Sequence, residues 1–322
     1  MSTSLITVFG GTGFLGRHAV RALAKAGHRL RVAVRYPNEG YFLPPMGHVG
    51  QIALVRCNVR EPADVAAATA GAEAVVNLTG ILHQSGAQSF EAIHCEAAEA
   101  IAGAAKAAGA RTLVHVSAIG ADKDSASRYA ATKAEGEARV RAVFPEAAIV
   151  RPSLVFGPED DFFNRFAALA RILPALPLIG GGHTRFQPVF VGDVAAAIAR
   201  LAEEPALGGA VYELGGPNVY SFKEMMQIVL RETGRKRMLV PVPFALATLK
   251  AMFMQFLPKP LLTPDQVTLL KSDNVVTGPD GLAALGIVPT SVEAEVPAYL
   301  WRFRPKGQYD ELPRLSEAPA PQ

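Results

Sequence analysis

Residues 6–17 read Ile-Thr-Val-Phe-Gly-Gly-Thr-Gly-Phe-Leu-Gly-Arg, and this stretch decides the fold class. The apolar run Ile6–Phe9 predicts a strand. Three glycines, Gly10, Gly13 and Gly16, then predict a tight turn into a helix. Small residues let a main chain approach a pyrophosphate closely, and the free N–H groups of a helix start favour an anion. The alternative is a tight turn without a ligand. We predict a dinucleotide phosphate loop formed by Gly10, Thr12, Gly13, Phe14, Leu15, Gly16 and Arg17.

This strand-to-helix step is repeated along the first half of the chain. Short apolar runs alternate with alanine-rich helical stretches as far as about residue 152, which is typical of a parallel sheet with crossover helices. We expect strands at Ile6–Phe9, Leu30–Val34, Ile52–Cys57, Ala74–Leu78, Thr112–Ser117 and Ala148–Arg151. We expect helices near Phe14–Ala26, Ala63–Ala70, Phe90–Ala108 and Ser127–Val143. The sequence therefore predicts an α/β fold, a Rossmann-type doubly wound parallel sheet, with ligands at the carboxyl ends of its strands.

The alternation stops after Phe156-Gly157-Pro158. A strand at Gln187–Phe190, a helix at Asp193–Ala202 and a strand at Val211–Leu214 are expected to return to the first domain. We thus assign residues 1–156, with 187–215, to the dinucleotide-binding domain, and 157–186 with 216–307 to a smaller, mostly helical lobe. Capping boxes are expected there at Ser221 with Glu224, Thr263 with Gln266 and Thr290 with Glu293. The polar, proline-rich residues 308–322 predict a disordered tail.

Composition excludes several classes of protein. The net charge of +3 is too slight to indicate nucleic acid as a partner, although it permits loose attraction to an anionic membrane surface. Cys57, Cys95 and the seven histidines form no metal-binding motif, so we expect reduced thiols and no metal site. The N-terminus has no signal or transit sequence, and no run of about 18 uncharged apolar residues occurs. We therefore expect neither export nor a spanning helix.

The end of the second strand indicates which dinucleotide is bound. An NAD site usually has an acidic residue there, which accepts hydrogen bonds from the ribose 2′-hydroxyl. Here the strand ends in Arg35, and a guanidinium suits a 2′-phosphate, with help from Arg17 at the helix start. We predict NADPH; the alternative is that both arginines are solvated surface residues. We expect the adenine and ribose to be lined by residues that follow the third and fourth strands, namely Asn58, Val59, Asn77, Leu78, Thr79 and Gly80. The alternative is that these are ordinary loop residues without a ligand.

Tyr129 and Lys133 lie four residues apart on a predicted helix and therefore share one face. An ammonium beside a phenol favours the phenolate, so we expect Lys133 to lower the pKa of Tyr129 and also to hold ribose hydroxyls. Ser117, at the end of the fifth strand, is placed to orient a substrate carbonyl or hydroxyl. The bare Tyr-x-x-x-Lys pattern is weak, and its position after a glycine-rich loop gives it weight. Turnover of a substrate is a separate and weaker inference.

Taken together, these residues resemble the extended short-chain dehydrogenase/reductase family over nearly the whole folded chain. The resemblance is closer to one branch, the dehydrogenase-like accessory subunit of respiratory complex I (NADH:ubiquinone oxidoreductase). The segments that carry it are Gly10–Arg17 (GGTGFLGR), Ser127–Glu137 (SRYAATKAEGE), Phe144–Ala167 (FPEAAIVRPSLVFGPEDDFFNRFA) and Gln187–Ala195 (QPVFVGDVA). The glycine loop is shared by many families, whereas the third segment is quite specific.

That resemblance implies tightly held NADPH and a structural role among the other subunits of complex I. It implies a peripheral position beside the membrane arm, on the cytoplasmic face of a bacterial inner membrane or the matrix side of a mitochondrial one. Ser117, Tyr129 and Lys133 match the family's catalytic serine, tyrosine and lysine, and Pro152 joins the residues expected to contact the cofactor. One departure is His94, which stands where active members usually have asparagine.

Two other functions remain open. One is a free NADPH-dependent reductase or epimerase that acts on a small-molecule or quinone-like substrate, and the other is a redox-sensing regulator that binds NADPH and a protein.

Residues Phe244–Leu257 (FALATLKAMFMQFL) are apolar on nearly every face of a predicted helix, with Lys250 as the only charge. Such a helix must be buried against something. It either belongs to the core of the small lobe, or contacts a partner protein, or lies in a membrane interface with Lys250 and Lys259 reaching toward headgroups.

Overall fold

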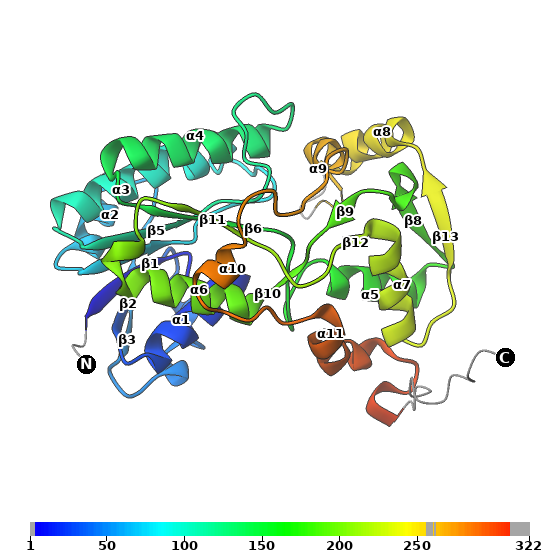
Figure 1. Cartoon of the computed structure of the whole chain (residues 1–322), viewed down its shortest axis with the longest axis horizontal. Helices are drawn as coiled ribbons and strands as arrows, with labels where there is room; N and C mark the ends of the chain where they lie inside the picture. Colours follow the sequence, from blue (N-terminus) through cyan, green and yellow to red (C-terminus); the bar gives the residue numbers. More distant parts are fainter. Residues whose placement is uncertain (1–3, 256–259, 261, 310–322) are drawn as a thin grey trace.

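A seven-stranded parallel sheet forms the centre of the larger part of the molecule (Figure 1). The computed structural model describes residues 4–255, 260 and 262–309. Its strands follow the order β11-β6-β5-β4-β1-β2-β3, and every neighbouring pair is parallel. They are β1 (Leu5–Phe9), β2 (Arg29–Val34), β3 (Ile52–Arg56), β4 (Ala74–Asn77), β5 (Thr112–Val116), β6 (Ala148–Pro152) and β11 (Val211–Leu214). The predicted doubly wound sheet is confirmed.

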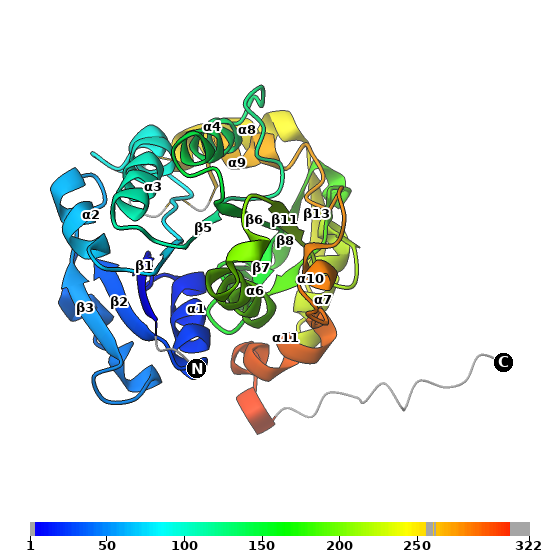
Figure 2. The same ribbon diagram turned by 60° about the vertical axis from the view of Figure 1, so that its left-hand side comes forward.

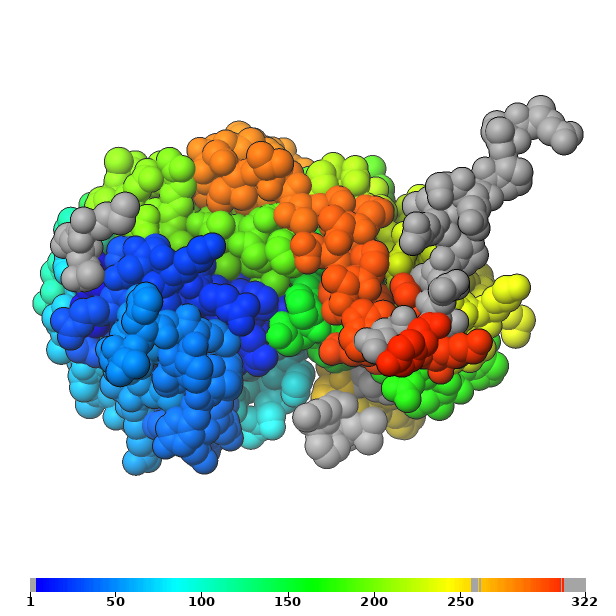
Figure 3. All heavy atoms as spheres, turned by 90° about the horizontal axis from the view of Figure 1, so that it is seen from below, coloured from blue at the N-terminus to red at the C-terminus, as the bar shows by residue number. Residues whose placement is uncertain are grey.

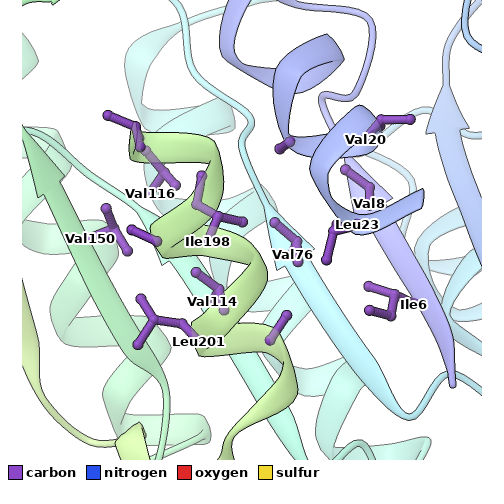
Figure 4. Close-up of a cluster of buried hydrophobic side chains, with 14 of the residues drawn as sticks. Ile6, Val8, Val20, Leu23, Val76, Val114, Val116, Val150, Ile198 and Leu201 are labelled. Carbon is purple, nitrogen blue, oxygen red and sulfur yellow. The ribbon is translucent and has the colours of Figure 1, made fainter. Parts of the chain in front are cut away.

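Helices cover both faces of this sheet because alternate strand residues point to opposite sides. On one face, α1 (Phe14–Lys25) and α6 (Val191–Glu203) bury Val20, Leu23 and Ile198 against strand residues such as Val8 and Val114 (Figure 4). The other face packs against α2 (Pro62–Thr69), α3 (Ala97–Ala107) and α4 (Arg128–Val143). Each aliphatic side chain buried in this way contributes roughly 1.5–3 kcal/mol to folding.

A smaller lobe packs beside the carboxyl ends of the strands (Figure 2). Its own core joins aromatic side chains, including Phe156, Phe163 and Phe222, to the sulfur-containing Met225 and Met226. Its helices are α5 (Phe163–Ile172), α7 (Phe222–Glu232), α8 (Phe244–Met254), α9 (Pro264–Leu269) and α11 (Val292–Leu300), whereas α10 (Gly281–Ala284) lies against the main sheet. Its strands are β8 (Ala175–Ile179), β9 (Arg185–Phe186), β12 (Tyr220–Ser221) and β13 (Met238–Val242). The short parallel pair β7 (Val155–Phe156) and β10 (Val189–Phe190) contributes side chains to the cores of both parts.

The two parts are joined by more than one crossing of the chain. β11 pairs with β6, and α10 places Leu282 and Leu285 in the core of the main sheet. In Figure 3 the orange segments that follow lie between the blue N-terminal residues and the yellow part of the small lobe. Asp193 on α6 accepts hydrogen bonds from Thr290 N and Thr290 Oγ1. The lobes are therefore held together from several sides.

Some element predictions need correction. Capping boxes are present at Ser221 with Glu224 and at Thr263 with Gln266. The box at Thr290 with Glu293 is wrong, because Thr290 bonds Asp193 and Ser291 caps α11 instead.

Two predicted elements also differ in their geometry or extent. The helix expected over Phe90–Ala108 begins with a π-helical turn, Glu91–Glu96. The strand expected from Gln187 is only Val189–Phe190. Gln187 lies before it, and its side chain donates to Gly216 O and accepts from Val276 N.

Two further predictions fall partly outside the described residues, namely the last two residues of the Phe244–Leu257 helix and the tail, of which 310–322 are not described. Within the described part of the chain, no helix has the length and hydropathy needed to span a membrane.

Candidate functional site

The glycine loop has the geometry of a close phosphate cradle. Gly10 has a φ of 78°, and a Cβ there would lie 2.9 Å from the Leu78 carbonyl. A Cβ at Gly16 would overlap the Gly10 carbonyl oxygen. Gly13 is the N-cap of α1, without a side-chain cap, and the first turn holds no acidic residue. The first N–H groups of a helix lack partners within it, so those of Phe14, Leu15 and Gly16 are available to an anion.

The two arginines beside this loop have different surroundings. Arg17 lies 4.0 Å from Glu159 and over the ring of Phe42, at 4.9 Å, while Thr12 O accepts a 3.5 Å hydrogen bond from it. Arg35 is exposed directly after β2, with its guanidinium 5.9 Å from the Tyr36 ring. The structure thus places Arg35 at the carboxyl end of β2 and gives Arg17 an acidic neighbour, Glu159, that the sequence did not reveal.

The remaining loop residues follow the carboxyl ends of adjacent strands. Asn58 N donates to Asp64, and Val59 packs at the edge of the core under α2 and α3. Thr79 is fixed by its N–H and hydroxyl, which both donate to Asn77 Oδ1. Leu78, Gly80 and Pro152 lie at the ends of β4 and β6. Because β4 lies between β1 and β5, the residues that follow β4 lie between the glycine loop, which follows β1, and Ser117, which follows β5.

Ser117 and Lys133 lie together at the end of β5, and the Tyr129 ring lies against His94 and Phe90. Ser117 lies one residue past the strand, 4% exposed, and its Oγ has no hydrogen-bond partner among the described residues. Lys133 is buried on α4, and its ammonium donates to Val116 O at 3.1 Å. A Cβ at Gly80 would lie 3.3 Å from Lys133 Nζ. Tyr129 lies one turn earlier on α4. The unpartnered Ser117 hydroxyl and the nearby Lys133 ammonium are suited to hydrogen-bond the hydroxyls of a ribose.

The expected lowering of the Tyr129 pKa is wrong for this structure. Burial, and secondly the carboxylate of Asp265, raise the pKa of Tyr129 to about 12. Burial also lowers the pKa of Lys133 to about 8, against the opposing charge of Glu137. The expectation considered only Lys133, whereas burial of the phenol and the Asp265 carboxylate from the small lobe set the direction of the shift. The phenol is therefore held protonated.

His94 lies in the π-helical turn and completes this wall of the site. Its Nε2 accepts a hydrogen bond from Ile81 N at 3.2 Å, and its Nδ1 lies 3.0 Å from Thr132 Oγ1. Burial, and then the charge of Lys133, lower the pKa of His94 to about 3, so the ring is neutral and joins the loop after β4 to helix α4. Its ring stacks on Phe90 at 5.3 Å and meets Tyr129 edge-on at 5.4 Å.

Gly136 allows this arrangement because a Cβ there would overlap the His94 carbonyl oxygen. The π turn and α4 can therefore approach closely only where α4 has a glycine.

Sequence reasoning missed two residues of the site, His115 and Asp265. Asn77 and His115 are cross-strand neighbours on β4 and β5, and Asn77 Nδ2 lies 3.0 Å from His115 Nδ1. A histidine inside the apolar run Thr112–Val116 was the available signal. Asp265, on α9, accepts hydrogen bonds from Ser127, Arg128 and Tyr129, and no local pattern points to it.

A cavity of about 630 Å³ lies between the two lobes, and Asp265 is one of the residues that line it. His83, Phe90 and Arg128 line it from the larger domain, and Thr248, Asp265 and Lys271 from the small lobe. In the part of the chain that the structure describes, no group of three or more His, Cys, Asp or Glu side chains could hold a metal ion. Cys57 and Cys95 are buried free thiols.

Comparison with known proteins identifies the family. Residues 6–215 match the NAD dependent epimerase/dehydratase family. The chain is 35% identical over 320 residues to the mitochondrial NADH dehydrogenase (ubiquinone) 1 alpha subcomplex subunit 9 of Arabidopsis thaliana, covering 95% of this chain and 80% of the relative. It belongs to this subunit 9 family. The predicted resemblance to an accessory subunit of complex I is confirmed.

Two further similar proteins match a smaller share of the chain or have a lower sequence identity. The ceramide reductase of Caulobacter vibrioides is 34% identical over 239 residues, 74% of each chain. The solved structure of an Escherichia coli NADPH-dependent quinone oxidoreductase with NADPH superposes with a TM-score of 0.72, covering 92% of this chain and 99% of that one at 21% identity. That likeness shows the fold alone. The subunit 9 family thus has the fold of proteins that bind NAD or NADPH.

Proposed function

We propose that this chain is an NADPH-binding accessory subunit of respiratory complex I with a structural rather than a catalytic role. The observation that carries the proposal is the extent of the similarity, because the subunit 9 relative matches 95% of the chain and therefore includes the small lobe. The match to the ceramide reductase covers 74%. A free reductase or epimerase is accordingly the less favoured function.

In this proposal the dinucleotide lies along the carboxyl ends of the strands. The α1 amides and Gly13 hold the pyrophosphate, Arg35 with Arg17 holds the 2′-phosphate, and Ser117 with Lys133 meets the nicotinamide ribose. Support comes from the tight glycine cradle, the unpartnered Ser117 Oγ and the exposed Arg35 at the end of β2. NADPH bound there can supply a hydride, but in this proposal it serves to stabilise the fold.

The state of the proton-transfer groups supports a structural role. A general acid or base works best when its pKa lies near the operating pH. Here the pKa of Tyr129 is raised to about 12 and that of His94 is lowered to about 3. Both groups are thus poorly matched to proton transfer near neutral pH.

The surface of α8 supports attachment to another subunit. The helix buries only one side, through Ala247 and Ala251. Its other side exposes Leu246, Leu249, Met252 and Phe253, the last with 73% of its surface accessible. Exposed apolar stripes of this kind mark protein contacts. We assign the stripe to a neighbouring subunit at the membrane boundary, on the cytoplasmic or, in mitochondria, the matrix side.

Isolation from native membranes in mild detergent tests the proposal directly. The expected result is that the protein comigrates with the subunits of NADH:ubiquinone oxidoreductase and carries NADPH in near-equal amount. A protein that elutes alone and oxidises NADPH over many turnovers with a carbonyl or quinone would establish the free reductase instead. Copurification with an unrelated regulator would establish the redox sensor.

A further inference from the structure

One carboxylate from the small lobe holds the start of the helix that carries Tyr129 and Lys133. Asp265 accepts hydrogen bonds from Ser127 Oγ at 2.9 Å, from Arg128 N at 2.7 Å and from Tyr129 N at 3.2 Å. Ser127 is itself the N-cap of α4 and accepts from Ala130 N. The first turn of α4 therefore depends on a residue more than a hundred positions away in the sequence, since Ser127 and Asp265 are 138 residues apart.

The electrostatics of this contact make it strong. The first N–H groups of a helix carry partial positive charge, and a carboxylate that accepts from them forms charge-assisted hydrogen bonds. Asp265 also lies in the first turn of α9, which begins with its own capping box at Thr263. The single carboxylate thus faces two helix starts and favours their close approach.

The other side of α9 leads to the exposed stripe of α8. Ala247 and Ala251, the buried residues of α8, pack in one small cluster with Val267 of α9. Val267 follows Asp265 by two positions on the same helix. A continuous path of packed and hydrogen-bonded groups therefore runs from the α8 surface, through α9, to the backbone of Tyr129.

We propose that Asp265 is a positioning residue that couples the dinucleotide site to the α8–α9 surface, so that cofactor occupancy and docking of the small lobe stabilise each other. The inference rests on the proposed function, because it takes NADPH to bind against α4. Ordering α4 by the cofactor strengthens the Asp265 contact and orders α9. By thermodynamic linkage, a partner that orders α8 and α9 must tighten NADPH binding by the same factor.

The test compares Asp265→Ala and Asp265→Asn with Asp280→Ala in the full chain. Asp280 is a matched control, because it caps α10 in the same way, accepting from Leu282 N and Ala283 N, without touching α4. NADPH dissociation is followed by fluorescence, and amide hydrogen exchange of α8 and α9 is measured with and without NADPH. In the wild type, NADPH should slow exchange in α8 and α9.

Asp265→Ala should release NADPH at least about tenfold faster and lose that slowing, while Asp280→Ala keeps both properties. Asp265→Asn, which retains one acceptor oxygen, should be intermediate and serves if the alanine variant does not fold. NADPH release and protection equal to the wild type in either folded variant would overturn the coupling and leave the proposed function intact. A wild type that binds no NADPH would instead overturn the proposed function, and the coupling with it.

Discussion

Arg35 is the residue on which the choice of cofactor depends. Its guanidinium lies exposed at the end of β2, with no acidic residue beside it in the strand. We predict that NADPH binds more tightly than NADH by roughly ten- to a hundredfold, because an arginine–phosphate contact contributes about 1.5–3 kcal/mol. Titration calorimetry should show this preference and its loss in Arg35→Asp. Arg21→Asp, an exposed change on α1, controls for net charge, and equal affinities in the wild type would contradict the NADPH assignment.

Lys133 and Tyr129 should separate cofactor retention from chemistry. Lys133 is buried and donates to Val116 O beside the orphaned Ser117 hydroxyl, whereas Tyr129 is held protonated. We predict that Lys133→Ala purifies with much less NADPH, and that Tyr129→Phe retains nearly full occupancy. Bound nucleotide is measured by extraction and chromatography. The structural role is disproved if the wild type turns over NADPH with any acceptor and Tyr129→Phe abolishes that turnover.

His94 should make stability depend on pH. Its folded pKa of about 3 lies below the ordinary 6.5, so the unfolded chain binds the proton first as pH falls. Stability is therefore fully present above about pH 6.5 and decreases toward pH 3, by about 1.4 kcal/mol per pH unit for each such histidine. His115 behaves in the same way.

Denaturation in urea at several pH values checks this prediction. His94→Asn should reduce the slope below pH 6.5, because His115 is then the only one left of the two buried histidines whose pKa is lowered. The exposed His48→Asn should leave the slope unchanged. If the free energy of unfolding changes with pH in the same way in the wild type and in His94→Asn, His94 has the same proton affinity in the folded and unfolded states, and the prediction is wrong.

At the scale of elements, local patterns predicted the strands, the glycine loop and two capping boxes, because their causes lie within a few residues. The π-helical turn Glu91–Glu96 was missed since a 3.6-residue periodicity does not show one inserted residue. The Tyr129 pKa was mispredicted for a related reason. Asp265 and the burial of the phenol come from the tertiary fold, and no spacing in Ser127–Glu137 encodes either.

The contact between α4 and the π turn leads to a prediction with opposite signs at two glycines. A Cβ at Gly136 would overlap the His94 carbonyl, whereas Gly103 on α3 has no atom within 4 Å of such a Cβ. We predict that Gly136→Ala lowers the free energy of unfolding by about 1–3 kcal/mol. Gly103→Ala should raise it by roughly 0.5–1 kcal/mol, because alanine restricts the unfolded chain. Both are measured by chemical denaturation, and stabilisation by Gly136→Ala would show that the helices do not pack this closely.

On the scale of the whole molecule, the structure of the larger domain could be predicted from the sequence more fully than that of the small lobe. The Rossmann part repeats a strand-to-helix unit, so each occurrence of the pattern in the sequence supports the assignment of the following one. The small lobe contacts the Rossmann part through hydrogen bonds between residues far apart in the sequence, such as those of Asp193 with Thr290 and of Asp265 with α4. Its apolar α8 could not be assigned to core or surface from sequence, since Ala247 and Phe253 look equally apolar until packing separates them.

That separation allows docking and folding to be tested on one helix. Phe253 lies on the exposed stripe of α8 and Ala251 on its buried side. Several exposed side chains of this size, each contributing roughly 1.5–3 kcal/mol when covered, are enough to dominate attachment. We predict that Phe253→Glu stays folded and keeps NADPH, yet no longer sediments with native membranes. Ala251→Glu should lose folding and cofactor together, because it places a charge in the α8–α9 contact.

Gln255→Glu provides the matched control, since it adds the same charge at an exposed position of the same segment and should sediment like the wild type. If Phe253→Glu also sediments normally, the stripe is not the attachment surface. If it unfolds, the stripe belongs to the core. Binding to protein-free lipid vesicles that is lost in Phe253→Glu would replace a neighbouring subunit with the lipid surface itself as the occupant of α8.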